Sequence, residues 1–265
     1  MKYDCYVRPR SQLGNVLFQY AFCSYYSLQH NMTPYMAVDG LLNRWWNDYS
    51  KSHLFNNGNI INSISKRYVT ISPQKHSREY VTFDHVDDNI FFDGLFQSPK
   101  YWNNDKDFIF DLFGYDNNLI DEIKLLYNDI DFDNVISIHM RRTDFFVNMS
   151  QYINTVDYVY NIINTYLPDE KHFIILSDDL SWCRNNMKDE RFIFADRSSS
   201  KYPKLLIDMF LMTLCKGNII NNISTFSWWG SYLNKNKDRK VYYSSKCGTT
   251  YDFIPDNDNW IDTKF

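Results

Sequence analysis

A strand-like run of apolar residues ends in a cluster of charged side chains. Residues 135–140 (VISIHM) are apolar and partly β-branched, and they lead directly through His139 into Arg141, Arg142 and Asp144. A planar guanidinium binds phosphate oxygens through paired hydrogen bonds, so two adjacent arginines are typical of a site for a doubly anionic group. A salt bridge between Arg142 and Asp144 at a strand end is the alternative, and this segment alone leaves both open.

Two more polar motifs occur where a strand is expected to give way to a helix. Ser177, Asp178 and Asp179 follow the apolar run 172–176. A carboxylate in this place can accept hydrogen bonds from a guanine edge or from ribose hydroxyls, and capping of the next helix is the alternative. Residues 224–227 (STFS) put hydroxyls and backbone N–H groups at a helix start, which favours an anion.

Three other patterns are less specific. The turn SQLGN (residues 11–15) contains one glycine and matches neither G-x-G-x-x-G nor a Walker A pattern. The arrays DIDFD (residues 129–133) and DND (residues 256–258) resemble the D-x-D pattern that binds Mg²⁺ or Mn²⁺ in some nucleotide-sugar enzymes. A solvated turn is the simpler interpretation of the first array, and the second lies near the C-terminus between expected loops. Trp228 and Trp229 are expected in the core rather than at a ligand.

Composition excludes bulk nucleic-acid binding. The 265 residues include 28 Lys plus Arg against 32 Asp plus Glu, with a pI of about 5.8 and no basic run. Nucleic-acid binding needs a net basic face, so paired arginines in an acidic chain indicate a small anion. Aromatic residues reach 18%, and their faces can stack on sugars or bases.

The cysteines and the apolar segments indicate a cytoplasmic protein. Five scattered cysteines form no C-x-x-C pair, which fits neither a zinc site nor a disulfide framework. The N-terminal residues lack a signal-peptide core, and no run approaches the ~20 apolar residues of a membrane span. One of three N-x-S/T sequons, at Asn222, lies inside the STFS motif region, where a glycan would not fit.

The second half of the sequence alternates strand and helix patterns. Apolar runs that read as strands occupy 135–140, 172–177, 191–195, 217–222 and 240–245, and helical patterns separate them. This alternation predicts a doubly wound parallel sheet, whose ligands bind at the carboxyl ends of the strands. In the first half, residues 13–31 and 116–129 read as helices, started by Asn15 and capped by Asp116 respectively, and residues 40–100 show little periodicity.

Six segments, taken in order, resemble the α-1,2-fucosyltransferase family (glycosyltransferase family 11). They are LGNVLFQYAF, FFDGLFQSPKYW, SIHMRRTDFF, FIILSDDLSWCRNN, LMTLCKGNIINNISTFSWWGSYLNKN and PDNDNWIDT, and together they span nearly the whole chain. H-x-R-R-x-D and STFSWWG, in this order, are the most specific of these motifs.

The resemblance implies a GT-B-like α/β fold and a metal-independent, inverting transfer of L-fucose from GDP-β-L-fucose. The implied product is an α-1,2 linkage to the 2-hydroxyl of a galactose in a glycan. No cofactor is expected, and the partners are GDP-fucose and a β-galactoside acceptor. Residues 1–133 would form an acceptor-side half, and residues 134–265 a Rossmann-like half that binds the GDP-sugar.

The resemblance also implies roles for single residues. Arg141 would contact the diphosphate, His139 would lie near the nucleotide, and Asn15 would reach the β-phosphate. Asp144 is the candidate base, with a structural salt bridge as its alternative. The implied catalytic residues are Arg141, Asp144 and Asn15, and the implied GDP-sugar contacts are His139, Arg142, Gly14, Ser177, Asp178, Asp179, Ser224, Thr225, Phe226 and Ser227.

Several residues depart from the family pattern. Ser11 and Gln12 replace Gly-Gly, Val16 replaces Gln, Thr143 replaces Gly, Gly217 replaces His, and the segment before STFS is one residue longer. These departures leave the acceptor open. A relative that binds glycan or nucleotide without turnover, and the same fold acting on another GDP-sugar or acceptor, are the alternatives.

Overall fold

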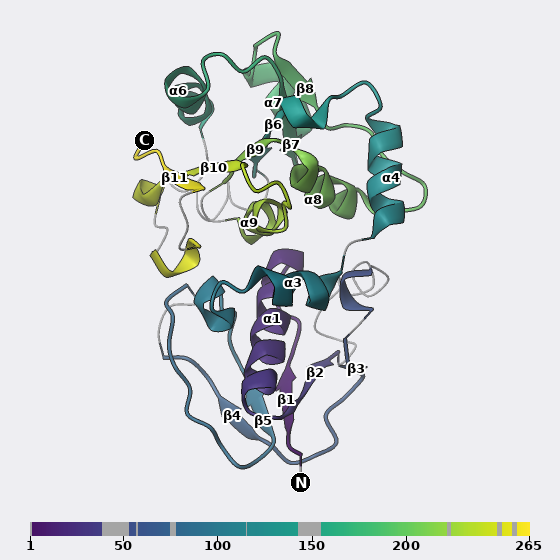
Figure 1. Ribbon diagram of the computed structural model, residues 1–265, viewed down its shortest axis with the longest axis vertical. Helices are drawn as coiled ribbons and strands as arrows, with labels where there is room; N and C mark the ends of the chain where they lie inside the picture. The colour runs from purple at the N-terminus through teal and green to yellow at the C-terminus, as the bar shows by residue number, and fades with distance from the viewer. Residues whose placement is uncertain are drawn as a thin grey trace. The chain divides into compact units, whose positions relative to one another are not determined.

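The computed structural model divides the chain into two compact α/β units (Figure 1). It describes residues 2–38, 53–56, 58–74, 78–114, 116–142, 155–221, 224–247, 251–255 and 259–265. Unit 1 comprises Met1–Tyr115 and Thr250–Asp256, and unit 2 comprises Asp116–Thr249 and Asn257–Phe265.

Unit 1 contains a five-stranded sheet in the order β3-β2-β1-β5-β4, and all of its pairings are parallel. The long helix α1 packs against β1 and β2. The elements are β1 (Asp4–Val7), α1 (Leu13–Gln29), β2 (Thr33–Ala37), η1 (His53–Phe55), β3 (Ile60–Ile61), β4 (Val69–Ile71), β5 (Ile90–Phe92), η2 (Pro99–Trp102), α3 (Lys106–Phe113) and η6 (Tyr251–Phe253).

Helix α1 begins at Leu13, the first residue of the segment expected to be helical. Gln12 occupies the N-cap position, so the prediction that Asn15 starts this helix is wrong, and Asn15 lies within the first turn. The N–H of Asn15 bonds to the carbonyl of Gln12 at 2.9 Å. Leu13 is buried and anchors the first turn to the core, two residues before Asn15.

Unit 2 contains a six-stranded sheet in the order β11-β10-β9-β6-β7-β8, again parallel throughout. This confirms the parallel sheet predicted from the strand–helix alternation. The elements are α4 (Asn117–Leu126), η3 (Phe132–Asn134), β6 (Ile136–Met140), α6 (Val156–Tyr166), β7 (Phe173–Ser177), α7 (Leu180–Asn186), β8 (Phe192–Phe194), α8 (Lys204–Leu214), β9 (Gly217–Ile219), α9 (Thr225–Tyr232), β10 (Lys240–Tyr243), η5 (Ser245–Cys247) and β11 (Trp260–Asp262).

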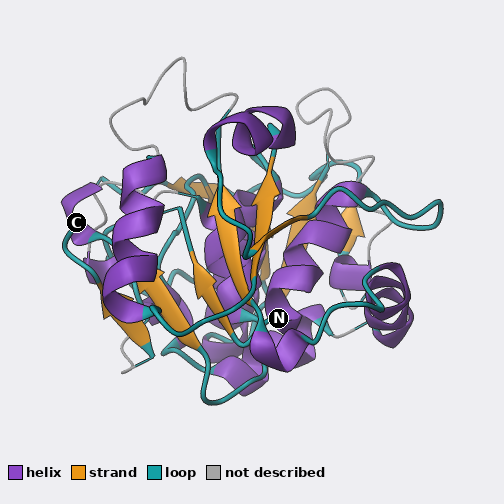
Figure 2. Cartoon of the chain, turned by 90° about the horizontal axis from the view of Figure 1, so that it is seen from above, coloured by secondary structure: helices purple, strands orange, loops and turns teal. Residues whose placement is uncertain are grey.

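Helices cover both faces of this second sheet, and Figure 2 shows the strands in orange with helices beside them. Alternate residues of β6 face opposite sides, as strand geometry requires. Ile136, Ile138 and Met140 belong to a buried cluster with residues of α6 and α7. Ser137 faces the other side, where it accepts a hydrogen bond from Asn218, whose amide also bonds to the carbonyl of Met212 in α8.

The two units divide between residues 115 and 116, whereas the sequence suggested 133 and 134. Helix α4 belongs to unit 2 because it packs against α8. Arg197 reinforces this attachment by bonding to the carbonyl of Leu126 at 2.7 Å and pairing with Asp129. The predicted N-cap Asp116 is confirmed, since its carboxylate accepts from the N–H groups of Asn118 and Leu119.

In the described part of the chain, no helix is both long enough and apolar enough to span a bilayer.

Candidate active site

The strand order of unit 2 indicates where a ligand would be expected to bind. Strand β6 lies between β7, which follows it in sequence, and β9, which is reached only after the chain crosses back. Neighbouring strands whose connections run in opposite directions leave a crevice at their carboxyl ends, and parallel α/β sheets bind ligands there. The motifs that follow β6, β7 and β9 therefore share one edge of the sheet.

Asp178 joins the end of β7 to the two arginines after β6. One carboxylate oxygen accepts from the backbone N–H of Arg142 at 2.7 Å, and the other lies 3.3 Å from a terminal nitrogen of Arg141. The side chains of Arg141 and Asp178 are only 16% and 19% exposed. Asp178 thus fixes both the backbone and the guanidinium at this strand end, and the predicted Arg142–Asp144 salt bridge falls partly outside the described residues.

Arg142 is held by an indole ring. The centre of its guanidinium lies 3.4 Å from the ring centroid of Trp182 in α7, an arrangement that favours a cation. Asp179 positions this ring, because its carboxylate caps α7 by accepting from the N–H of Trp182 at 2.9 Å. Ser177 tightens the same turn by accepting from the N–H of Asp179.

His139 lies on the opposite face of β6 from this indole. Its ring is 4% exposed and tilted against Phe226 of α9, with the ring centroids 5.2 Å apart. Burial, reinforced by the positive charge of Arg141 and partly offset by Asp178, lowers the pKa of His139 to about 3. The imidazole is therefore neutral at pH 7, and its buried Nδ1 has no hydrogen-bond partner among the described residues.

The start of α9 completes this edge of the sheet. Ser224 is the N-cap and accepts from the N–H of Ser227 at 3.5 Å. Thr225 and Phe226 are partly buried in the first turn, where helix geometry leaves backbone N–H groups without an intrahelical acceptor. Ser227 is fully buried and bonds to the carbonyls of Asn221 and Ser224, so the structure places it within the turn.

In unit 1 the predicted residues Gly14 and Asn15 lie in the first turn of α1, directly after the loop that leaves β1. Asn15 accepts a hydrogen bond from Nε2 of Gln97 at 2.5 Å. Ser11, in the same loop, has a φ of 68°, a left-handed conformation that favours glycine. The family pattern has glycine at this position, so the backbone gives a physical reason for that preference.

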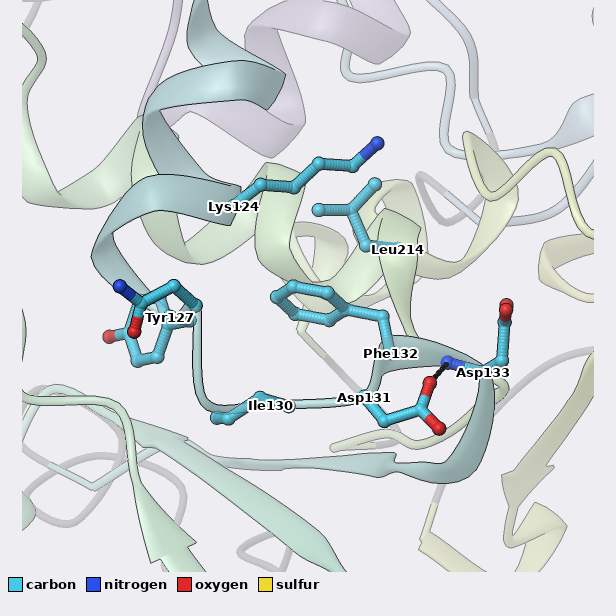
Figure 3. A pocket seen from close by; sticks show the side chains of 8 residues that line it. Lys124, Tyr127, Ile130, Asp131, Phe132, Asp133 and Leu214 are labelled. Atoms are coloured by element: carbon cyan, nitrogen blue, oxygen red, sulfur yellow. Dashed lines mark hydrogen bonds between the residues drawn. The ribbon is translucent and has the colours of Figure 1, made fainter.

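The first D-x-D-like array has structural roles. Asp129 pairs with Arg197, and Asp131 caps η3 by accepting from the N–H of Asp133. In Figure 3 the carboxylates of Asp131 and Asp133 point apart beside a pocket lined also by Lys124, Tyr127, Asn128, Ile130, Phe132 and Leu214. Because η3 precedes β6, this pocket lies at the amino end of that strand. Among the described residues, no three His, Cys, Asp or Glu side chains gather as a metal site.

Some predicted residues lie outside the described part of the chain, and some functional neighbours were not predicted. Thr143, Asp144 and the second D-x-D-like array (residues 256–258) fall outside it. Trp182 and Gln97 lie within the quoted motifs FIILSDDLSWCRNN and FFDGLFQSPKYW, but their residue types alone gave no role. Trp228 and Trp229 are fully buried, which confirms their expected place in the core.

Comparison with known proteins identifies the family. Residues 49–252 match the model of glycosyl transferase family 11. The chain belongs to this family. The family 11 chain is also 33% identical over 162 residues to the O-antigen biosynthesis glycosyltransferase WbnK of Escherichia coli, covering 55% of this chain and 51% of the relative. It is 30% identical over 164 residues to an alpha-1,2-colitosyltransferase of the same organism, covering 57% and 53%. These matches span about half the length of each relative.

Solved structures show the fold of this family 11 member. Fucosyltransferase NodZ from Bradyrhizobium aligns with a TM-score of 0.59 at 13% identity, over 87% of this chain and 93% of NodZ. POFUT1 in complex with GDP-fucose aligns with a TM-score of 0.52 at 9% identity, over 91% and 96%. The α/β fold with parallel sheets is therefore GT-B-like, as predicted.

Proposed function

We propose that this family 11 glycosyltransferase transfers L-fucose from GDP-β-L-fucose to the 2-hydroxyl of a galactose in a glycan, with inversion and without a metal ion. The observation that carries the proposal is the pair Arg141 and Arg142 at the carboxyl end of β6, the strand between β7 and β9, where Asp178 and Trp182 hold them. Guanidiniums fixed in this way suit a diphosphate, and family membership supports a sugar nucleotide as the donor.

In the proposed reaction the bond between fucose C1 and the β-phosphate oxygen breaks, and its electron pair leaves with GDP. The acceptor 2-hydroxyl oxygen forms the new bond to C1 from the opposite face, and its proton passes to a base. Negative charge grows on the diphosphate as the bond stretches, and Arg141 stabilises this charge. A preorganised donor of this kind typically contributes about 10²–10³ in rate.

The neutral state of His139 suits a role beside the nucleotide. An imidazole with a pKa near 3 cannot add a second positive charge at pH 7, but it can exchange hydrogen bonds through its ring nitrogens. The N–H groups at the start of α9 would give further donors for phosphate oxygens. Asp144 as the base, and a cytoplasmic location, stay predictions.

A second candidate donor is GDP-colitose, whose sugar is an L-fucose without the 3-hydroxyl. The similarity to an alpha-1,2-colitosyltransferase, 30% identical over 57% of this chain, favours it. The same leaving group and the same linkage chemistry would apply, so the arginine site does not separate the two donors.

The test is a screen of donors and acceptors. The purified chain is incubated with labelled GDP-fucose or GDP-colitose and a panel of β-galactosides, in EDTA, and the linkage of the product is read by NMR. We expect an α-1,2 product at undiminished rate in EDTA. Loss of transfer in EDTA would overturn metal independence. GDP binding by calorimetry without turnover of either donor would instead indicate a binding protein, and absence of both binding and turnover would refute the proposal.

A further inference from the structure

Three polar side chains form a continuous hydrogen-bonded relay in unit 1. Nε of Arg78 donates to Oε1 of Gln97 at 3.2 Å, and Nε2 of Gln97 donates to Oδ1 of Asn15 at 2.5 Å. Arg78 is 7% exposed and Gln97 is 5% exposed, while Asn15 is partly exposed. Gln97 follows β5 and Asn15 follows β1, and these strands are parallel neighbours, so the relay ends at the carboxyl edge of the sheet.

The chemistry of the first member fixes the orientation of the other two. A guanidinium has only N–H donors, so the Gln97 atom facing Arg78 must be the carbonyl oxygen. Gln97 therefore turns its NH₂ group toward Asn15, and the Asn15 atom that receives it must be the carbonyl oxygen. This arrangement leaves the NH₂ group of Asn15 as a donor for another acceptor.

Buried packing holds the relay in place. The centre of the Arg78 guanidinium lies 4.3 Å from the ring centroid of Phe253, a fully buried side chain that also contacts Phe18 of α1. Ser98, next to Gln97, donates to the carbonyl of Asp252 at 2.5 Å. The segment 251–255 thus belongs to unit 1 and packs against Arg78 and beside Gln97.

A buried guanidinium has an energetic cost that folding alone does not require. Burial lowers the pKa of Arg78 to about 10, which leaves the group charged at pH 7. Removing a charge from water is unfavourable, and apolar residues of similar volume often replace buried charges without loss of stability. A role that depends on a donor-only group explains why a cation lies there.

We propose that Arg78 and Gln97 are positioning residues that hold the amide of Asn15 with its NH₂ group presented as a hydrogen-bond donor to an oxygen of a bound substrate. This inference rests on the proposed function, because the substrate is the sugar donor or the sugar acceptor of that reaction. Phosphate oxygens of the donor and hydroxyl oxygens of the acceptor share this acceptor chemistry, and KM values measured separately for the two substrates distinguish them.

The test is Gln97→Glu, which keeps the shape of the side chain but reverses the direction of its hydrogen bond with Asn15. A carboxylate still accepts from Arg78 but cannot donate, so Asn15 must turn its NH₂ group toward residue 97 and present its carbonyl oxygen instead. We expect kcat to fall by about tenfold or more, the scale of a lost or reversed hydrogen bond in a transition state. A rise in the KM for GDP-fucose would assign the contact to the diphosphate, and a rise in the KM for the galactoside would assign it to the acceptor.

Coupling distinguishes positioning from a structural effect. In an Asn15→Ala background, Gln97→Glu should change kcat by less than about twofold, because the group through which it acts is absent. Gln19→Glu is the matched control: Gln19 is also buried and bonds to the N–H of Arg10 and the carbonyl of Gly94, at the same sheet edge. Its effect on kcat should simply add to that of Asn15→Ala.

Two measurements keep the inference testable if Gln97→Glu is poorly folded or if the proposed function fails. Gln97→Met removes the relay without a charge and should lower kcat less than Gln97→Glu does. In ¹H–¹⁵N spectra the side-chain NH₂ signal of Asn15, assigned by its loss in Asn15→Ala, should move downfield in Gln97→Glu. Additive losses, or an unmoved Asn15 signal, would overturn the relay. A wild-type chain that turns over no GDP-sugar, together with a shifted Asn15 signal in Gln97→Glu, would overturn only the proposed function.

Discussion

Asp178→Asn distinguishes two roles for this carboxylate. If Asp178 positions the arginines, asparagine can keep one oxygen on the N–H of Arg142, but it then presents an NH₂ group to the guanidinium of Arg141. A donor would face a donor across 3.3 Å, and the guanidinium would move. If Asp178 instead accepts hydrogen bonds from a guanine edge, the main loss would be in nucleotide recognition.

The size of the effect follows from the geometry. Two unit charges 3.3 Å apart attract by roughly 5 kcal/mol at an effective dielectric constant of about 20. Solvent screening and desolvation reduce the net value to about 1–3 kcal/mol, the range for hydrogen bonds to charged groups. Displacing a catalytic guanidinium by about 1 Å costs up to roughly 10² in rate, so kcat should fall by about 10–10².

The assay compares kcat for transfer with the Kd values of GDP and IDP, whose base lacks the 2-amino group. Positioning predicts a lower kcat with the Kd of GDP within about threefold of wild type, because the lost negative charge offsets the lost orientation. Normal turnover with a tenfold weaker Kd for GDP, and loss of the preference over IDP, would refute the positioning role.

Asp189→Asn is the matched control for this experiment. Asp189 also accepts a hydrogen bond from a backbone N–H, that of Arg191, and its carboxylate pairs with the guanidinium of Arg191 at 2.7 Å. This pair precedes β8 and so lies at the amino end of that strand. For Asp189→Asn we expect a lower Tm with unchanged kcat, because the lost ion pair lies away from the candidate site.

Further predictions concern single side chains. Arg141→Lys should lower kcat by about 10² or more and Arg141→Ala further, with GDP affinity falling less, since a point charge cannot form paired hydrogen bonds; Arg191→Lys, which should leave kcat unchanged, is the control. Trp182→Leu should lower kcat more than Trp182→Phe, which keeps an aromatic face under Arg142. The pKa of His139 is about 6.5 in the unfolded chain and about 3 in the folded chain, so the unfolded chain binds a proton first as pH falls. The unfolding free energy of the wild type, measured by chemical denaturation relative to that of His139→Gln, should therefore decline as pH falls from 7 to 4. Ser11→Gly should be about 1 kcal/mol more stable than Ser11→Ala by the same method, because residue 11 has a positive φ; equal stabilities would refute this.

The sequence predicted the second sheet because β6 and β7 are buried apolar runs and helical patterns separate the expected strands. Strands β6 and β7 each have five residues, and nearly all are buried, so a parallel sheet covered on both faces was readable. The strands of the first sheet could not be predicted from the sequence in the same way. Its strands β3, β4 and β5 have only two or three residues, and two of them lie largely exposed at the sheet edges, so they leave no periodicity.

For the candidate site, the sequence predicted where the side chains lie on the sheet better than it predicted which groups they contact. The strand–helix alternation placed Arg141 and Asp178 at one sheet edge, but helix capping and base recognition were equally compatible with Asp178 and Asp179. The structure assigns capping to Asp179 and places Asp178 on the arginines, which depends on the register of β6 with β7. The relay joins residues 15, 78 and 97, and no local pattern connects positions so far apart.

The ion pair of Arg141 also has a cost that bears on the mechanism. A carboxylate beside the guanidinium reduces the attraction for a diphosphate, so in the proposed complex Asp178 would weaken ground-state binding of the nucleotide. The same carboxylate holds the guanidinium before substrate arrives, and the site then needs less reorganisation as charge grows on the leaving group. Only stabilisation that increases toward the transition state raises kcat. In the proposed reaction, a site with Arg141 held by Asp178, Arg142 held by Trp182 and a neutral His139 would therefore favour bond breaking over tight retention of GDP, which would also have to leave after each turnover.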